Sequence, residues 1–417
     1  MLLASLDGQA ERTALPVELW DLIFGFVPVR ADLAALSTVS SSFYDLATRH
    51  LYRDLSLRRG VPTVQQCLVL ARKARLSRHV RSMAVNFGLD AIDRAGASRT
   101  RSYPRVPTEM FAPAYVRLFF RTCNACARLS TLSFSSYLEF DRTLTANLFR
   151  FPPPVDYLEV GARGPPAEIL NALPNVERLY MLKIFGENII NLSPSALPKL
   201  RSVRCSLRQA ETLIPGRPVR EVALEATVLD VDLLPRVIDA LSRSTAPIQG
   251  LDLKLRSFDL DTFRQIGAVF PALREFVLTV LDVQLTALFD LSPEDWVTCG
   301  GFSQLSHLHA LEIHAFYGPL PSTGLTVPLR PVIDKIGQAC PSLNLVTIVD
   351  RGTTHSHEVA VPNYRVVRCG QAWQTQMTYR NCRNRRSPLF AGYFGDLLDS
   401  MGVRGEENPG RPQCWVM

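Results

Sequence analysis

The chain of 417 residues is predicted to have an α/β fold, in which three short N-terminal helices lead directly into a long array of strand–helix units with a parallel sheet. Three observations predict this fold. Apolar residues recur three times at helical spacing between residues 15 and 57, an apolar strand pattern recurs after them, and helix-patterned segments separate the strands. The hydrophobic content of 47% is sufficient for a large core.

Breaks in the apolar pattern separate the three N-terminal helices. Pro16 fits a first helical turn, where its missing N–H costs nothing; Pro28 interrupts the pattern before Asp32, and residues 40–42 interrupt it again. About forty residues in three small helices cannot bury enough apolar surface to be stable alone. The unit must therefore pack against the rest of the chain or against a separate protein.

Three motifs lie in this helical unit: L-P-x-E-L from Leu15, D-L-x-x-L-x-x-V-S-x-x-F from Asp32 and L-Y-R from Leu51. Together they resemble the F-box, a family in which the helices bind a Skp-type adaptor and, through it, the cullin of a ubiquitin ligase. The family more often has Cys and Trp where this chain has Ser40 and Phe43. The alternative is an ordinary helical cap on the following domain. The resemblance implies adaptor contacts by Leu15, Pro16, Leu19, Ile23, Leu36, Val39 and Phe43.

The strand pattern apolar-x-x-apolar-x-apolar begins at twelve positions. A long interval of 49 residues separates Val80 from Leu129, and we interpret it as two units of which one is disguised. Helix-patterned segments lie between strands at 233–243, 260–270 and 329–339. The first residues of the twelve strand patterns are Tyr52, Val80, Leu129, Val155, Val176, Leu200, Val219, Ile248, Leu273, Leu308, Leu343 and Tyr364.

Alternating strands and helices at these intervals are typical of leucine-rich repeats, so the whole chain resembles F-box proteins with leucine-rich repeats of the irregular, fungal type. The Asn or Cys that regular repeats place two residues after the third apolar position is absent from all twelve, so the backbone turns must be satisfied in another way. We expect a disordered N-terminus at 1–12, an F-box at 13–57, a solenoid with its parallel sheet on the concave face at 58–376, and a basic segment, short helix and disordered tail at 377–417.

The concave sheet face is the candidate surface for binding a target protein. The second and third apolar positions of each strand point into the core, so the residues between and beside them face the opposite side. This row combines basic and aromatic groups near the middle with acids further along, although outward strand residues are polar whatever they bind. Its members are Tyr157, Glu159, Arg178, Tyr180, Arg204, Glu221, Glu225, Asp252, Lys254, Glu275, Glu312 and His314.

Positive charge is concentrated in one part of the chain. The net charge is +7, yet residues 49–105 contain thirteen Arg or Lys against three Asp, so the remainder sums to −3. Such a stretch can attract nucleic acid or an acidic protein face. Because no nucleic-acid-reading motif accompanies it, we interpret it first as a solvated arginine-rich surface.

No pattern predicts catalysis, a cofactor or a metal site. Cys123 and Cys126 form C-x-x-C on a helix without a second pair at zinc spacing, which favours a buried helix face. The sequence shows no nucleophile elbow and no phosphate-cradling glycine loop. The last four residues have the form C-a-a-X, so Cys414 is a candidate for farnesylation, and membrane attachment is expected only if that modification occurs.

The sequence leads to two hypotheses about function. With no predicted signal peptide or membrane span, and with an odd number of nine cysteines, we expect a cytoplasmic or nuclear protein with reduced thiols. The first hypothesis is a non-catalytic substrate receptor of a Skp–cullin–F-box ubiquitin ligase, bound to an unidentified target. The alternative is a repeat scaffold, or a nucleic-acid binder through residues 49–105, that is unrelated to ubiquitin.

Overall fold

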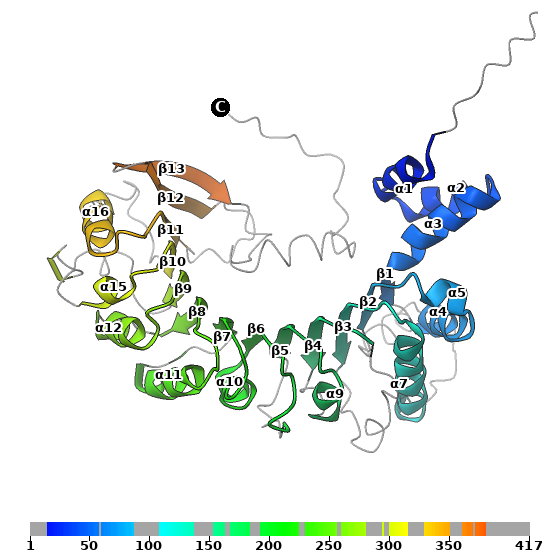
Figure 1. The fold of residues 1–417 in the computed structure, drawn as a ribbon, viewed down its shortest axis with the longest axis horizontal. Helices are drawn as coiled ribbons and strands as arrows, with labels where there is room; N and C mark the ends of the chain where they lie inside the picture. Colours follow the sequence, from blue (N-terminus) through cyan, green and yellow to red (C-terminus); the bar gives the residue numbers. More distant parts are fainter. Residues whose placement is uncertain are drawn as a thin grey trace, which may run out of the picture.

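The computed structural model describes residues 15–57, 60–86, 108–136, 153–162, 167–183, 192–224, 229, 231–256, 260–280, 294–295, 300–315, 329–350, 361–369 and 372–380. Within these residues thirteen strands form one sheet, and their order in the sheet is their order in the sequence. The sheet curves into an arc, with helices along its outer side and the three N-terminal helices beyond one end (Figure 1). The predicted mixed α/β fold is confirmed.

The N-terminal unit consists of α1 (Val17–Gly25), α2 (Arg30–Leu36) and α3 (Ser41–Arg53), as the apolar pattern predicted. Ser40 begins α3, because its hydroxyl accepts the backbone N–H of Phe43 at 3.2 Å. The outer helices are α4 (Gly60–Arg72), α5 (Ala74–Ser77), α7 (Thr108–Ala125), α9 (Ala167–Asn171), α10 (Leu207–Leu213), α11 (Leu234–Ser242, after a 3₁₀ turn at Val231–Leu233), α12 (Leu260–Val269), α15 (Gly301–Gln304) and α16 (Leu329–Ala339).

Eleven consecutive strands are parallel, and each begins two residues after a predicted pattern start, which confirms those eleven predictions. They are β1 (Asp54–Leu57), β2 (Ser82–Asn86), β3 (Thr131–Ser136), β4 (Tyr157–Ala162), β5 (Arg178–Lys183), β6 (Ser202–Cys205), β7 (Glu221–Leu224), β8 (Gly250–Leu255), β9 (Glu275–Val280), β10 (Ala310–Ala315) and β11 (Leu345–Asp350).

Two expectations about the array were wrong. β2 pairs directly with β3, so the long interval between Val80 and Leu129 does not hide a further strand of the sheet. At the other end, β12 (Val361–Cys369) and β13 (Ala372–Arg380) are antiparallel, and β13 extends past the predicted boundary at 376. Because β12 folds back along β11, the hairpin covers an edge that would otherwise expose unpaired backbone groups.

One continuous core extends from Leu55 at the start of the array to Val366 in β12. It lies between the sheet and the outer helices, so each strand–helix unit buries its apolar side chains mainly against its neighbours. The N-terminal helices have a separate, small core around Phe24. The protein therefore consists of a long array and a bundle that shares little buried surface with it.

A column of backbone hydrogen bonds precedes the strands. The carbonyl of the residue just before each strand accepts N–H groups from the next unit; that of Arg81, for example, accepts from Ser130 and Thr131 at 2.9 and 3.0 Å. Nine successive carbonyls each accept two N–H groups in this way. These carbonyls belong to Arg81, Ser130, Asp156, Glu177, Arg201, Arg220, Gln249, Arg274 and His309.

Buried side chains satisfy other turn carbonyls and thereby replace the missing Asn or Cys. The clearest case is Arg217, which is 3% exposed and donates to five carbonyls at 2.8–3.2 Å. Ser244 donates to the carbonyls of Arg217 and Val219 in the same manner. Burial lowers the pKa of Arg217, so the five hydrogen bonds must offset its desolvation. The carbonyls that Arg217 contacts are those of Ser193, Ala196, Thr212, Leu213 and Pro215.

We predict that Arg217→Met lowers the free energy of unfolding by about 3 kcal/mol or more, because methionine fills the space but removes the guanidinium donors of five buried or partly buried carbonyls. Chemical unfolding followed by circular dichroism measures the loss. Arg220→Met is the control, since Arg220 is exposed and should change stability by no more than about 0.5 kcal/mol. Equal losses in both variants would contradict this role.

Candidate functional site

The N-terminal helices bury few side chains of their own. Phe24, Leu33, Leu46 and Ala47 are buried, and partly buried aromatic rings surround them. The ring of Phe43 lies 4.9 Å from that of Trp20 and 5.2 Å from that of Phe24. One cluster of aromatic side chains thus forms the centre of this small core, and most other apolar residues of the unit lie outside it.

Apolar side chains instead lie on the surface of this unit. Among the described residues eleven large hydrophobic side chains are exposed, and nine of them belong to residues 15–44. Phe26 is 78% exposed and Val39 is 65% exposed. Such a concentration of apolar surface is typical of a protein-binding site. The nine residues, called here the apolar face, are Leu15, Val17, Leu19, Leu22, Ile23, Phe26, Val29, Val39 and Tyr44.

The structure divides the seven predicted adaptor contacts into two groups. Leu15, Pro16, Leu19, Ile23 and Val39 are exposed. Leu36 and Phe43 are half-buried, because both pack against the small core. Five residues of the apolar face were not among the predicted contacts, namely Val17, Leu22, Phe26, Val29 and Tyr44. The helical apolar spacing of residues 15–26 could have indicated Leu22 and Phe26.

No linker separates the bundle from the array. α3 ends at Arg53 and β1 begins at Asp54. Arg75 forms an ion pair with Asp45 of α3, and its guanidinium lies 5.8 Å from the ring centre of Tyr44. Arg30 donates to the carbonyl of Asp54. These polar contacts fix the bundle on the first unit, and among the residues of the apolar face they involve Tyr44, which remains 44% exposed.

The register places the predicted concave residues of β4 to β10 in rows across the sheet. One row joins Tyr157, Arg178, Glu221 and Glu275 at matched positions, and a second joins Glu159, Tyr180, Arg204, Asp252 and Glu312. A third row contains Lys254 and His314. Glu225 lies outside the described residues.

Aromatic and basic side chains pair between neighbouring strands in the middle of this face. The guanidinium of Arg178 lies 5.5 Å from the ring centre of Tyr157, and that of Arg204 lies 5.0 Å from the ring centre of Tyr180. A carboxylate oxygen of Asp156, Oδ2, lies 3.8 Å from a guanidinium nitrogen of Arg178. These contacts hold the guanidinium groups over the rings. The ring of Tyr157 differs from the expectation of an accessible side chain, because it is 3% exposed, so the accessible part of this β4 to β6 surface consists of the half-buried Arg178, Tyr180 and Arg204.

Acidic groups follow on β7 to β9. Burial and the negative charge of Glu221 raise the pKa of Glu275, while His309 acts in the opposite sense. Gly250 separates Glu221 from Glu275 in the row, so no intervening side chain screens the two carboxylates. The face therefore changes from basic to acidic along the arc.

The end of the concave face differs from the expectation of an accessible surface. Glu312 and His314 are each 6% exposed and form a hydrogen bond with one another. Val277 and Thr279 at neighbouring positions are also buried. Buried polar groups are hydrogen-bonded within the protein. These two residues are therefore less suited to binding a target than the β4 to β6 surface.

The C-x-x-C pair is structural, as its position on an apolar helix indicated. Cys123 and Cys126 are fully buried, and burial raises the pKa of both thiols, that of Cys126 to about 12. In the described part of the chain no group of three His, Cys, Asp or Glu could hold a metal ion. Cys414 lies outside the described residues.

None of the helices that the structure describes combines the length and the apolar character needed to cross a bilayer.

We predict that the buried cysteines resist alkylation in the folded protein at pH 8, because they are shielded and the pKa values of most of them are raised; that of Cys67 is about 11. Mass spectrometry after treatment with iodoacetamide, with and without urea, identifies the modified positions. Rapid labelling without urea would contradict the packing described here. The five cysteines are Cys67, Cys123, Cys126, Cys205 and Cys340.

Comparison with known protein families gives a match over the N-terminal helical unit. No curated protein sequence matches the chain. A family model described as F-box-like matches residues 13–58, a range that contains α1 to α3 and β1 and nearly coincides with the predicted F-box at 13–57. The match supports the interpretation of the chain as an F-box protein, with an F-box-like domain at residues 13–58.

Proposed function

We propose that the chain is the substrate-recognition subunit of a Skp–cullin–F-box ubiquitin ligase. The observation that carries the proposal is the apolar face, which lies within the F-box-like domain and is left uncovered by the array. A Skp-type adaptor binds this face and connects the chain to a cullin. The chain itself is not catalytic in this proposal, and it acts in the cytoplasm or nucleus.

Burial of the apolar face supplies the free energy for adaptor binding. Fully burying a leucine, isoleucine or phenylalanine side chain stabilises by about 1.5–3 kcal/mol. Several exposed residues of α1, together with Val39 after α2, could be buried at once, whereas Leu36 and Phe43 act mainly by keeping the helices in position. The partner must offer a complementary apolar groove, since the face includes few charges that could steer it.

In the same proposal the array is a leucine-rich-repeat solenoid whose concave face holds the target. Its parallel strands in sequence order, outer helices and continuous core support this assignment. Arg178, Tyr180 and Arg204 of β5 and β6 form the centre of the target site, because tyrosine and arginine contribute most to protein interfaces. The mechanism is proximity: the target's lysines are held near a charged ubiquitin carrier.

We predict that Leu19→Asp with Val39→Asp reduces capture of a purified Skp-type adaptor by about a hundredfold or more, because two carboxylates would be buried without partners. Surface plasmon resonance with the full chain measures the effect. Both side chains are exposed, so circular dichroism should show an unchanged fold.

Leu68→Asp is the matched control, since Leu68 is 36% exposed on α4 and lies outside the F-box-like domain. It should leave adaptor affinity within about twofold of wild type. If the double variant bound as tightly as wild type, or if the control lost as much, the adaptor assignment would be wrong.

We also predict that Tyr180→Ser with Arg204→Ser removes the target without affecting the adaptor, because it eliminates one aromatic–basic pair from the concave face. Affinity capture from the native host with the proteasome blocked, quantified against wild type, measures both partners. The control Arg236→Ser removes an arginine from an outer helix, where it pairs with Glu211.

Proteins lost with the concave variant and retained with the control are the candidate targets. If wild type, the Tyr180→Ser/Arg204→Ser variant and the Arg236→Ser control all captured the same proteins, the surface around Tyr180 and Arg204 would be excluded as the target site. Capture of stable partners without any adaptor would favour the second hypothesis, a binding scaffold unrelated to ubiquitin.

A further inference from the structure

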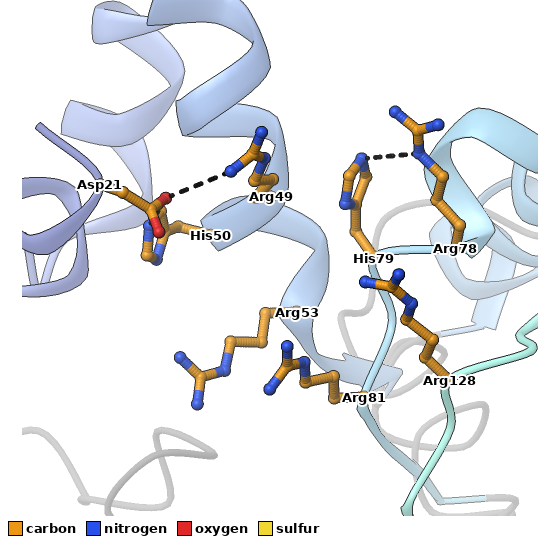
Figure 2. A pocket seen from close by; sticks show the side chains of 8 residues that line it. All are labelled: Asp21, Arg49, His50, Arg53, Arg78, His79, Arg81 and Arg128. Atoms are coloured by element: carbon orange, nitrogen blue, oxygen red, sulfur yellow. Dashed lines mark hydrogen bonds and ion pairs between the residues drawn. The ribbon is translucent and has the colours of Figure 1, made fainter. Parts of the chain in front are cut away.

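A hollow of about 450 Å³ lies where the bundle meets the array, and arginine side chains dominate its walls (Figure 2). It is separate from the apolar face and from the β4 to β6 surface. Its volume is within the range of sites for small molecules. The lining residues are Asp21, Arg49, His50, Arg53, Arg78, His79, Arg81 and Arg128.

Four separate segments bring these side chains together. α1 contributes Asp21, and the last turns of α3 contribute Arg49 and Arg53 among others. The turn after α5 contributes Arg78, and the turn before β3 contributes Arg128. Figure 2 shows the side chains from these elements arranged around one space.

The backbone hydrogen-bond column places Arg53 beside Arg81. The N–H of Arg81 donates to the carbonyl of Arg53 at 2.9 Å, so the two residues occupy the same position in successive units. Neighbouring strands are about 4.8 Å apart, which puts two guanidinium groups on adjacent steps of the sheet. Figure 2 shows both side chains extending in the same direction. The fold thus concentrates positive charge rather than separating it.

The hollow contains five arginines and one carboxylate. That carboxylate, Asp21, already lies 3.1 Å from His50 and 3.9 Å from Arg49. Within the described residues Arg81 and Arg128 have no ion-pair partner within 4 Å. Nε of Arg53 lies 3.8 Å from a carboxylate oxygen of Asp54. With Asp21 and Asp54 both counted against the five arginines, the local charge remains positive.

The pKa of His79 reflects the positive charge of the hollow. Burial lowers its pKa first, and the positive charges of Arg78, Arg49 and Arg128 lower it further. Nε of Arg78 donates to Nε2 of His79 at 3.4 Å, an arrangement that requires a neutral imidazole. The histidine thus serves as a neutral acceptor that orients Arg78 and adds no charge.

We propose that this hollow binds a compact polyphosphate anion, in which two or more phosphate groups are joined on a small scaffold. Guanidinium groups match phosphate oxygens in bidentate geometry. One phosphate group accommodates about two such contacts, so five arginines exceed the needs of a monophosphate. A bound polyphosphate would bridge α3 and the turns before β2 and β3, and would thereby fix the bundle on the array.

Isothermal titration of the full chain with tripolyphosphate tests the proposal. We expect one site, affinity that falls as salt is added, and orthophosphate binding at least about tenfold weaker. Arg81→Gln with Arg128→Gln should weaken tripolyphosphate binding at least about tenfold, because both lost side chains are exposed, line the hollow and form no ion pair with another described residue.

The matched control is Arg201→Gln with Arg220→Gln. These exposed arginines precede β6 and β7 and occupy the same hydrogen-bond column, but they do not line the hollow. The control removes the same charge and should bind within about twofold of wild type.

Equal weakening of both variants would show attraction by overall charge and would overturn the proposal, as would an absence of binding to wild type. A single-stranded RNA that bound where tripolyphosphate did not would also overturn it and favour a nucleic-acid surface. Adaptor binding is measured separately on the same variants, so failure here is distinguishable from failure of the proposed function.

Discussion

The structure depends on the column of backbone carbonyls that precedes the strands. Because each carbonyl accepts N–H groups from the next unit, every strand begins at the same level as its neighbours. That alignment produces the concave rows, including the contacts of tyrosine and arginine on β4 to β6. It also stacks Arg53 on Arg81 at the edge of the sheet. One backbone interaction thus determines both the candidate target surface and the cationic hollow.

Much of the fold was predictable because stacking units repeat their pattern. The starts from Tyr52 to Leu343 located eleven strands, since core residues must recur at fixed spacing within each unit. The pattern at Tyr364 was apolar for the same reason, yet its strand reverses direction, because nothing in the spacing distinguishes a parallel strand from an edge hairpin. The antiparallel direction of β12 depends on the edge of β11 with which it pairs, and that edge exists only once the sheet has formed.

A candidate site could be predicted from the sequence only where its residues lie close together in one segment of the chain. The apolar face lies within about thirty residues, so its motif was visible, although the division between core and surface at Leu36 and Phe43 required packing. Arg217 carried no pattern, because its five carbonyls come from two turns. The cationic hollow joins Asp21 to Arg128, and its one signal was the charge excess of residues 49–105.

Strand order equal to sequence order has a consequence for synthesis. Each new strand pairs with one that has already left the ribosome, so the array can fold progressively from its N-terminal end without waiting for distant segments. The bundle emerges first, before the sheet on which α3 rests exists. Its exposed apolar residues would meet other cellular proteins at that stage, so a partner that bound them early would shield them while the sheet formed.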